Sequence, residues 1–395
     1  MTRFLKALTA PAMALLLVGA GAPDGAWTPA WTASMWQSAN PRQEVAVDNA
    51  TISFAVRVGA DGKAIRIRLS NEYGAAFRIG AASVRLRDGQ TVPVTFGGKS
   101  ATEVSANASI VSDPVRLTVK SFDVVDVSLY LPGSVRFNTV HAAGGAKTQI
   151  SAQGDHSRAP FVAARRTDNR PLLASVDVLG DAARPVVVAF GDSITDNPGC
   201  AIDATPICRW SDVLGRRLAK AGKPHVVVTQ AISGNRVISR GTGPSAVERF
   251  DRDVLALPGV THVVLLEGIN DIGGSGRARP DGTAAPTITD AELMAGYRDL
   301  VSRAHQRGIK VIAMTILPFE GAGYHSEAGE AMRTRINAWI RSSGTFDAVV
   351  DMERVVADPA NPRRLAPALH RGDFLHPNGE GEFAMGEAIP LNLFD

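Results

Sequence analysis

Hydrophobic and polar residues alternate along the first half of the chain. Every second side chain is Ile, Val, Leu or Phe in residues 52–58 and 65–69, and again in residues 84–86, 115–119 and 125–131. This period of two is typical of β-strands that bury one face and expose the other. The pattern therefore predicts a series of short strands.

The turns between these strands carry Gly, Asp and Pro. Asp88 and Gly89 predict a hairpin turn, and Pro93 in its second arm predicts a strand at a sheet edge. Many short alternating strands joined by such turns favour an antiparallel β-sandwich, of the jelly-roll kind, over residues 27–180.

After residue 185 the apolar residues come in continuous runs, which indicate strands buried on both faces. These runs are residues 186–188, 226–228, 263–266, 311–314 and 348–350.

Helical patterns lie between these runs. Thr289 and Glu292 form a capping box before an apolar stripe that ends ahead of Gly308, and a second stripe ends ahead of Gly344. Alternating strands and helices predict a doubly wound α/β domain over residues 185–395, joined to the first region within residues 181–184. Ligands bind such sheets at the carboxyl ends of the strands.

Four polar segments follow predicted strands or precede the last predicted helix, and all belong to this edge. They are residues 191–195 (Gly-Asp-Ser-Ile-Thr), 233–235 (Ser-Gly-Asn), 268–271 (Gly-Ile-Asn-Asp) and 373–377 (Asp-Phe-Leu-His-Pro).

Three side chains in these segments could carry out acyl transfer. A serine is a weak nucleophile until a histidine takes its proton, and a carboxylate must orient that histidine. Ser193 would be the nucleophile, His376 the base and Asp373 the orienting carboxylate. Asp373 stands three residues before His376, close enough to reach its inner ring nitrogen.

The tetrahedral intermediate needs hydrogen-bond donors for its oxyanion. We expect these to be the backbone N–H groups of Ser193 and Gly234 and the side-chain amide of Asn270, with the missing Cβ of Gly234 admitting the substrate. The structural alternative is that Ser193 only caps the following helix. Asp192 and Asp271 are expected to support their loops and receive no catalytic role.

These four segments together resemble the motif blocks of the SGNH (GDSL-type) serine hydrolase superfamily. The resemblance covers residues 185–395, with Ile194 where the name-giving motif has Leu. It implies a three-layer α/β/α flavodoxin-like fold and ester hydrolysis through an acyl-serine intermediate. It assigns the same roles to Ser193, Asp373 and His376, and the same oxyanion donors.

Finer features in residues 209–212, 233–236 and 249–253 are similar to an exported bacterial branch of arylesterases and acylhydrolases. That branch implies a short acyl group, often acetyl, on a polysaccharide or oligosaccharide, with the N-terminal sandwich as an accessory domain. The alternative within the superfamily is a lipase or lysophospholipase. A different alternative is a carbohydrate-binding protein with an inert hydrolase domain, in which aromatic side chains stack on sugars. The candidates for such stacking are Trp27, Trp31 and Trp36.

Residues 241–246, Gly-Thr-Gly-Pro-Ser-Ala, fit a dinucleotide-binding fingerprint, and Glu267 could be its ribose-binding acid. A nicotinamide-dependent oxidoreductase is therefore a further alternative. However, a loop containing Arg236 and Arg240 separates the preceding predicted strand from Gly241, so no tight strand-to-helix turn is expected. We predict no cofactor.

Residues 1–20 resemble a signal peptide, with Arg3 and Lys6 before an uncharged run that ends at Val18. That run is about a dozen residues, short of the ~20 that span a bilayer. We therefore expect a secreted or periplasmic protein without a membrane span. Cys200 and Cys208, the two cysteines of the chain, could form a disulfide in such a compartment.

Charge and composition exclude several partners. The chain has 42 Lys and Arg against 39 Asp and Glu, and no basic cluster is interleaved with aromatic residues. This composition argues against a nucleic-acid partner. Two cysteines and no His-Glu-x-x-His motif argue against a metal site.

Overall fold

The structure is a computed structural model of the 395-residue chain. It describes residues 25–38, 41–87, 89–142, 147–158, 161–200, 209–278 and 284–395. The predicted signal peptide, Asp88 of the predicted hairpin turn, and Cys208 lie outside these residues. Across the described part of the chain, every helix is too short or too polar to traverse a lipid bilayer.

A parallel sheet organises the C-terminal region, and its strands occur in the order β17-β16-β18-β19-β20. The first strand in sequence thus lies between the second and the third, which is the flavodoxin-like order. All six residues of β16 are buried, as expected for a continuous apolar run. The predicted α/β fold is confirmed. The strands are β16 (Val186–Gly191), β17 (Val226–Ala231), β18 (Val260–Leu266), β19 (Lys310–Met314) and β20 (Ala348–Val350).

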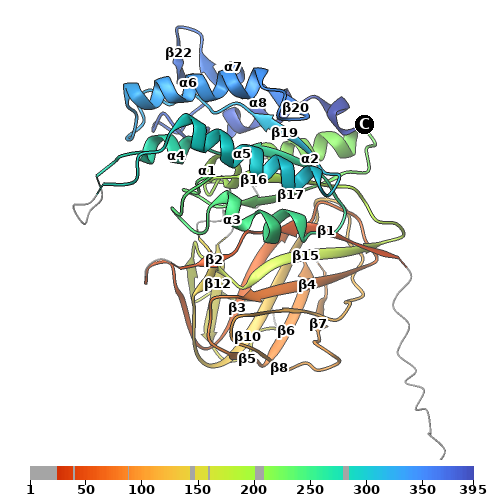
Figure 1. Cartoon of the computed structure of the whole chain (residues 1–395). Helices are drawn as coiled ribbons and strands as arrows, with labels where there is room; N and C mark the ends of the chain where they lie inside the picture. Colours follow the sequence, from red (N-terminus) through yellow and green to blue (C-terminus); the bar gives the residue numbers. More distant parts are fainter. Residues whose placement is uncertain are drawn as a thin grey trace, which may run out of the picture.

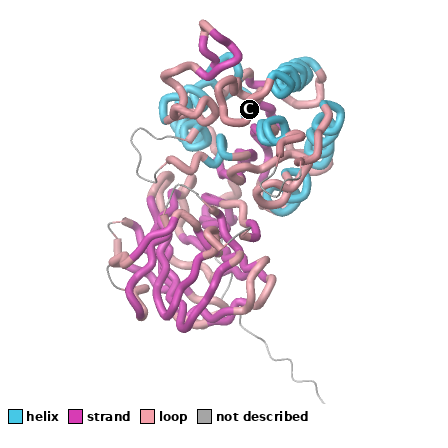
Figure 2. The backbone as a smooth tube through the Cα atoms, turned by 90° about the vertical axis from the view of Figure 1, so that its left-hand side faces the viewer, coloured by secondary structure: helices cyan, strands magenta, loops and turns pink. Residues whose placement is uncertain are grey.

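Helices lie on both sides of this sheet (Figure 2). The predicted capping box is confirmed, because Thr289 Oγ1 accepts a hydrogen bond from Glu292 N and Glu292 Oε2 accepts one from Thr289 N. The helices are α1 (Ser193–Asp196), α2 (Trp210–Lys220), α3 (Ala246–Phe250), α4 (Ile269–Gly274), α5 (Asp290–His305), α6 (Glu327–Ser342), α7 (Met352–Val356) and α8 (Gly379–Ala388). Smaller elements are the π-helix η1 (Asp251–Leu255), the 3-10 helix η2 (Leu391–Phe394), and the hairpin of β21 (Ala357–Asp358) and β22 (Asn361–Leu365).

The N-terminal region is built from antiparallel strands, an arrangement compatible with a β-sandwich. Its larger sheets have the orders β13-β12-β3-β10-β6-β7 and β1-β15-β4-β9, and its smaller ones β14-β11-β2 and β5-β8. Strand β7, which contains Pro93, lies at an edge as predicted. The strands are β1 (Ala26–Thr32), β2 (Trp36–Gln37), β3 (Val45–Arg57), β4 (Ala64–Asn71), β5 (Phe77–Ile79), β6 (Ala81–Leu86), β7 (Thr91–Val94), β8 (Thr102–Val104), β9 (Ala108–Val111), β10 (Val124–Phe137), β11 (Thr139–His141), β12 (Thr148–Gln153), β13 (Arg165–Thr167), β14 (Arg170–Pro171) and β15 (Leu173–Gly180).

The prediction of a strand over residues 115–119 is wrong. Val115 and Val119 form isolated bridges to Ile65 and Gly62 and are buried. Between these bridges the segment has one residue more than its partner, so a regular ladder cannot continue. The apolar residues alternate here because two of them are buried at isolated bridges, and not because the segment is a strand.

The two regions pack directly on each other, with the antiparallel sheets (red to yellow-green) beneath the parallel sheet and its helices (Figure 1). Strand β1 runs along β17, and Thr32 Oγ1 donates a hydrogen bond of 2.9 Å to Thr229 O. One cluster of buried apolar side chains continues through both regions. The edge strand β17 of the parallel sheet therefore lies against the N-terminal strands.

Candidate active site

The turn after β16 presents Ser193 at the start of α1. Asp192 Oδ1 accepts a hydrogen bond of 2.9 Å from Ile194 N and so caps this helix. The alternative that Ser193 serves as the cap is therefore wrong. Gly191 must lack a side chain, because a Cβ there would lie 2.2 Å from Leu266 O and 2.4 Å from Thr195 Oγ1.

Ser193, His376 and Asp373 come together from opposite ends of the C-terminal region. Ser193 Oγ lies 2.8 Å from His376 Nε2, and His376 Nδ1 lies 2.6 Å from Asp373 Oδ2. The other carboxylate oxygen of Asp373 accepts hydrogen bonds from the backbone N–H groups of Leu375 and His376. Partial burial acts to raise the pKa of Asp373, but these hydrogen bonds outweigh it and hold the pKa below its usual value. An ionised Asp373 can thus fix the ring of His376 with Nε2 toward the serine.

Gly234 lies in the turn after β17. Its φ of +79° belongs to the left-handed region, and a Cβ there would lie 2.7 Å from Thr242 Oγ1. The backbone conformation and the contact with Thr242 therefore require glycine at this position. Access for the substrate at Gly234 stays a prediction.

Asn270 lies in the first turn of α4, next to the nucleophile turn. Its Nδ2 is 3.3 Å from Asp192 Oδ2 and 3.0 Å from Asn235 O, while Tyr324 Oη donates to its Oδ1 at 3.4 Å. An amide nitrogen has two protons. Because the contact with Asp192 is the longer one, it is the contact that an oxyanion would replace with least loss.

The sequence analysis did not predict the supporting role of Arg249, and it predicted only part of the role of Asp271. Arg249 is fully buried and donates to Gly191 O, Gln230 O and Asn235 Oδ1 at 2.8–3.0 Å, so it ties the ends of β16 and β17 to the Gly234 turn. Residues 249–253 stood out in the sequence, but no local pattern indicates these long-range contacts. Asp271, expected to support the loop of Asn270, accepts hydrogen bonds from the backbone N–H groups of Val237 and Ile238 and so ties that loop to the segment after the Gly234 turn.

A group of carboxyl side chains is buried beneath these turns. Burial raises the pKa of Asp192 to about 7, that of Asp271 to about 6, and that of Glu267 well above its ordinary value. The carboxyl oxygens of Glu267 have no hydrogen-bond partner, and Arg249 Nη2 is 3.6 Å from one of them. Because like charges so close together are unfavourable, this group retains protons near neutral pH.

The dinucleotide fingerprint does not have the required geometry. Strand β17 ends at Ala231, and Gly241 and Gly243 form a bridge with each other in the loop that follows. Ala246 then begins α3, a helix of only 5 residues. Glu267 is buried next to Arg249 and does not face a ligand site.

The three tryptophans proposed as sugar platforms are engaged within the protein. Trp36 is completely buried, and Arg66 and Arg170 lie over the rings of Trp27 and Trp31.

The contacts of a serine, a histidine and an aspartate at the carboxyl edge of this sheet are those of a serine hydrolase. Residues 189–382 match the family model described as the GDSL-like Lipase/Acylhydrolase family. The chain therefore contains a GDSL-like lipase/acylhydrolase domain, and this domain makes it a carboxylic ester hydrolase. None of the curated proteins matches the chain.

Several solved structures resemble about half of the chain. A GDSL-like lipase from Bacteroides thetaiotaomicron is 21% identical, with 51% of this chain and 84% of that one covered and a TM-score of 0.37. The acetylxylan esterase Axe2 from Geobacillus stearothermophilus is 23% identical, with 52% and 91% covered and a TM-score of 0.39. At these scores the likenesses carry no argument about substrate.

Proposed function

We propose that the protein hydrolyses esters of short acyl groups, acetyl foremost, on a carbohydrate, through an acyl intermediate on Ser193. The observation that carries the mechanism is the unbroken contact from Ser193 Oγ through His376 to Asp373, at 2.8 and 2.6 Å. These are the distances needed for proton transfer from a nucleophile to a base.

The reaction follows from these contacts. Ser193 Oγ attacks the ester carbonyl carbon while His376 Nε2 takes its proton, and the resulting oxyanion accepts hydrogen bonds from Ser193 N, Gly234 N and Asn270 Nδ2. His376 then gives the proton to the departing alcohol. Water, deprotonated by the same nitrogen, attacks the acyl-serine, and the carboxylic acid leaves as Ser193 regains its proton.

The surroundings of Asn270 support a short acyl group. The ring of Tyr324 packs on Gly273, where a Cβ would lie 2.2 Å from it, and its hydroxyl contacts Asn270. This half-buried aromatic side chain occupies space beside the oxyanion donor. Residues 273–278 and 319–324, expected to border the site, consist mainly of small residues, which favours small acyl groups.

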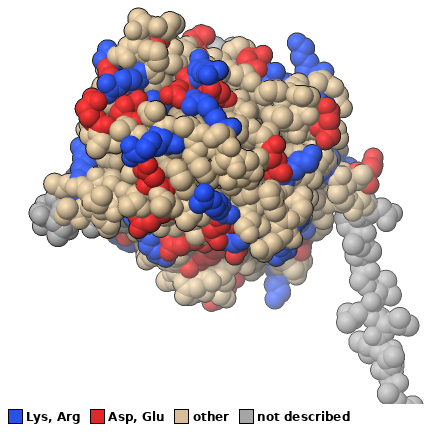
Figure 3. Space-filling model, turned by 45° about the horizontal axis from the view of Figure 1, so that its top comes forward, with Lys and Arg blue, Asp and Glu red and all other residues tan. Residues whose placement is uncertain are grey.

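Surface charge supports a neutral substrate. Among the described residues on the face shown in Figure 3, Lys and Arg are interspersed with Asp and Glu. A carbohydrate ester needs no field of one sign to approach such a surface.

The remaining sequence predictions complete the proposal. Residues 1–20 would direct export to the periplasm or medium, where buried Cys200 would pair with Cys208. Residues 27–180 would form an accessory domain of jelly-roll type, and residues 185–395 the catalytic domain.

The test is hydrolysis of 4-nitrophenyl esters from acetate to palmitate, with acetate release from acetylated xylan measured in parallel. We expect the wild type to prefer the acetate ester and to release acetate, and Ser193→Ala to lose about 10⁴-fold or more in kcat. A preference for long chains would indicate a lipase or lysophospholipase. Full activity of Ser193→Ala would overturn the mechanism, and an inactive wild type would favour a carbohydrate-binding protein.

A further inference from the structure

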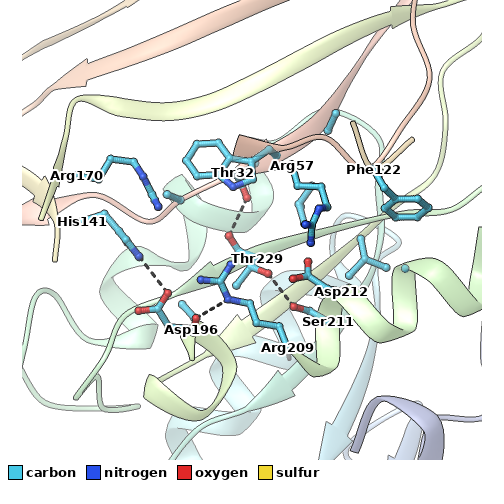
Figure 4. A pocket seen from close by; sticks show the side chains of 18 residues that line it. Thr32, Arg57, Phe122, His141, Arg170, Asp196, Arg209, Ser211, Asp212 and Thr229 are labelled. Carbon is cyan, nitrogen blue, oxygen red and sulfur yellow. Dashed lines mark hydrogen bonds and ion pairs between the residues drawn. The ribbon is translucent and has the colours of Figure 1, made fainter. Parts of the chain in front are cut away.

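A histidine of the N-terminal region contacts the short helix that begins at the candidate nucleophile. His141 ends β11 and is 3% exposed, with Nδ1 2.8 Å from Ser34 O and Nε2 3.1 Å from Asp196 Oδ1. Figure 4 shows this side chain pointing from the antiparallel strands toward Asp196. A carbonyl oxygen and a carboxylate are both acceptors, so each ring nitrogen of His141 faces an acceptor.

Asp196 connects this histidine with the catalytic turns. It is the last residue of α1, the helix that begins with Ser193, and its backbone O accepts a hydrogen bond of 2.7 Å from Arg209 Nε. Its Oδ2 accepts a hydrogen bond of 3.0 Å from Ser233 Oγ. Burial acts to raise the pKa of Asp196, but His141, Arg209 and Ser233 outweigh it and keep the pKa below the ordinary value.

Ser233 immediately precedes Gly234. The contacts therefore run without a gap from His141 through Asp196 to the residue next to a proposed oxyanion donor. The Gly234 peptide is already in a left-handed conformation. Because a glycine has wide conformational freedom, contacts of the neighbouring residues restrict the orientation of this peptide.

We propose that His141 is a positioning residue for ester hydrolysis, which acts through Asp196 and Ser233 to hold the Gly234 N–H toward the oxyanion. This inference rests on the proposed role of Gly234. It makes the N-terminal region part of the device that stabilises the transition state. A donor displaced by even a fraction of an ångström loses much of its effect on the oxyanion.

The interface offers a matched control. Thr32 Oγ1 donates to Thr229 O in β17 across the same interface, and the Thr229 side chain contacts Ser211 Oγ, not Asp196 or Ser233. A merely structural role for His141 would make its loss resemble the loss of Thr32. A positioning role predicts that the two differ in kinetics while they resemble each other in stability.

The experiment compares His141→Gln, Ser233→Ala, the double variant and Thr32→Val in the full chain. The measurements are kcat and KM for 4-nitrophenyl acetate, the inhibition constant of phenylboronic acid as a tetrahedral mimic, and Tm. We expect each of the first two variants to lower kcat about tenfold and to weaken boronic acid binding similarly, with KM nearly unchanged. The double variant should lose no more than either single one, because both act on one link. Thr32→Val should lower Tm and leave kcat unchanged.

Three results would overturn the proposal. They are an unchanged kcat in folded His141→Gln, losses that multiply in the double variant, and a kcat loss in Thr32→Val equal to that of His141→Gln. If His141→Gln does not fold, Ser233→Ala decides: an unchanged kcat and boronic acid affinity overturn the proposal, and a loss of both at constant KM supports it. Failure of the proposed function is distinct, since wild type would then be inactive on esters or Ser193→Ala would be active.

Discussion

The antiparallel and the parallel regions of this chain distribute their loops differently. Connections of antiparallel strands leave from both ends of the sheet, so this topology does not gather loop residues at one edge. All strands of the parallel sheet point the same way, so residues 191–195, 233–235 and 268–271 meet at one edge. Sheet direction therefore explains why one region carries the reaction and the other contributes through a few side chains at the interface.

The regions also differ in whether their buried carboxyl groups have hydrogen-bond and ion-pair partners. In the N-terminal region the buried carboxylate of Asp177 pairs with Arg66 at 2.9 Å and accepts a hydrogen bond from Ser175. Beneath the candidate site, Glu267 is buried without a hydrogen bond. The C-terminal region thus buries a carboxyl group unfavourably close to the candidate active site. Such unfavourable features are found at functional sites.

The largest effect should come from Asp373→Asn. An asparagine can hold His376 in the wrong tautomer, so we expect kcat to fall by about 10⁴-fold while the fold is kept. Steady-state kinetics on 4-nitrophenyl acetate measures this loss. Asp181→Asn is the matched control, since that carboxylate is exposed and pairs with Lys63 far from the site. Comparable losses in both variants would contradict the division of labour between the regions.

A smaller loss is expected for Asn270→Ala. Removal of one oxyanion donor typically lowers kcat by about 10²–10³-fold, with little change in KM. The comparison of kcat with KM is the decisive measurement. A change confined to KM would show that Asn270 binds the substrate and does not stabilise the transition state.

The buried carboxyl group of Glu267 predicts how the free energy of unfolding depends on pH. The raised pKa of Glu267 means that the folded protein binds a proton more tightly than the unfolded chain, so its contribution to stability is lost as pH rises from about 4.5 through the folded pKa. Glu267→Gln cannot ionise, and its free energy of unfolding should fall less between pH 5 and pH 8 than that of wild type. Urea denaturation at several pH values tests this, with Glu103→Gln on the exposed N-terminal surface as control. Equal pH dependence in variant and wild type would refute it.

The smallest effect on catalysis is predicted for Arg66→Ala in the N-terminal region. Arg66 is partly exposed but Asp177 is buried and would keep only the hydrogen bond from Ser175, so we expect a loss of about 1–3 kcal/mol in unfolding free energy. Arg66 also lies over Trp27, and the lost packing adds to this change. The value of kcat should stay the same, and a marked fall would mean that the two regions are coupled beyond the contacts of His141.

The sequence predicted the parallel sheet well because its strands are buried on both faces and therefore read as continuous apolar runs. It also placed Ser193, Asp373 and His376 on converging loops, since strand order and direction determine where the loops go. It failed at residues 115–119, where two buried side chains imitate a strand. The contacts of His141 had no local signal, because Asp196 lies in the other region of the chain and only the packing of the regions brings them together.

The contacts of Arg249 set a condition for exchanging modules between proteins of this architecture. Its guanidinium touches Ser34 Oγ of the N-terminal region at 3.2 Å as well as the ends of β16 and β17. A chimera that joins this hydrolase domain to a foreign partner would remove that hydroxyl and leave a buried cation incompletely solvated. Grafts that carry the segment of Ser34 together with the hydrolase domain should therefore express better than grafts cut at residue 185.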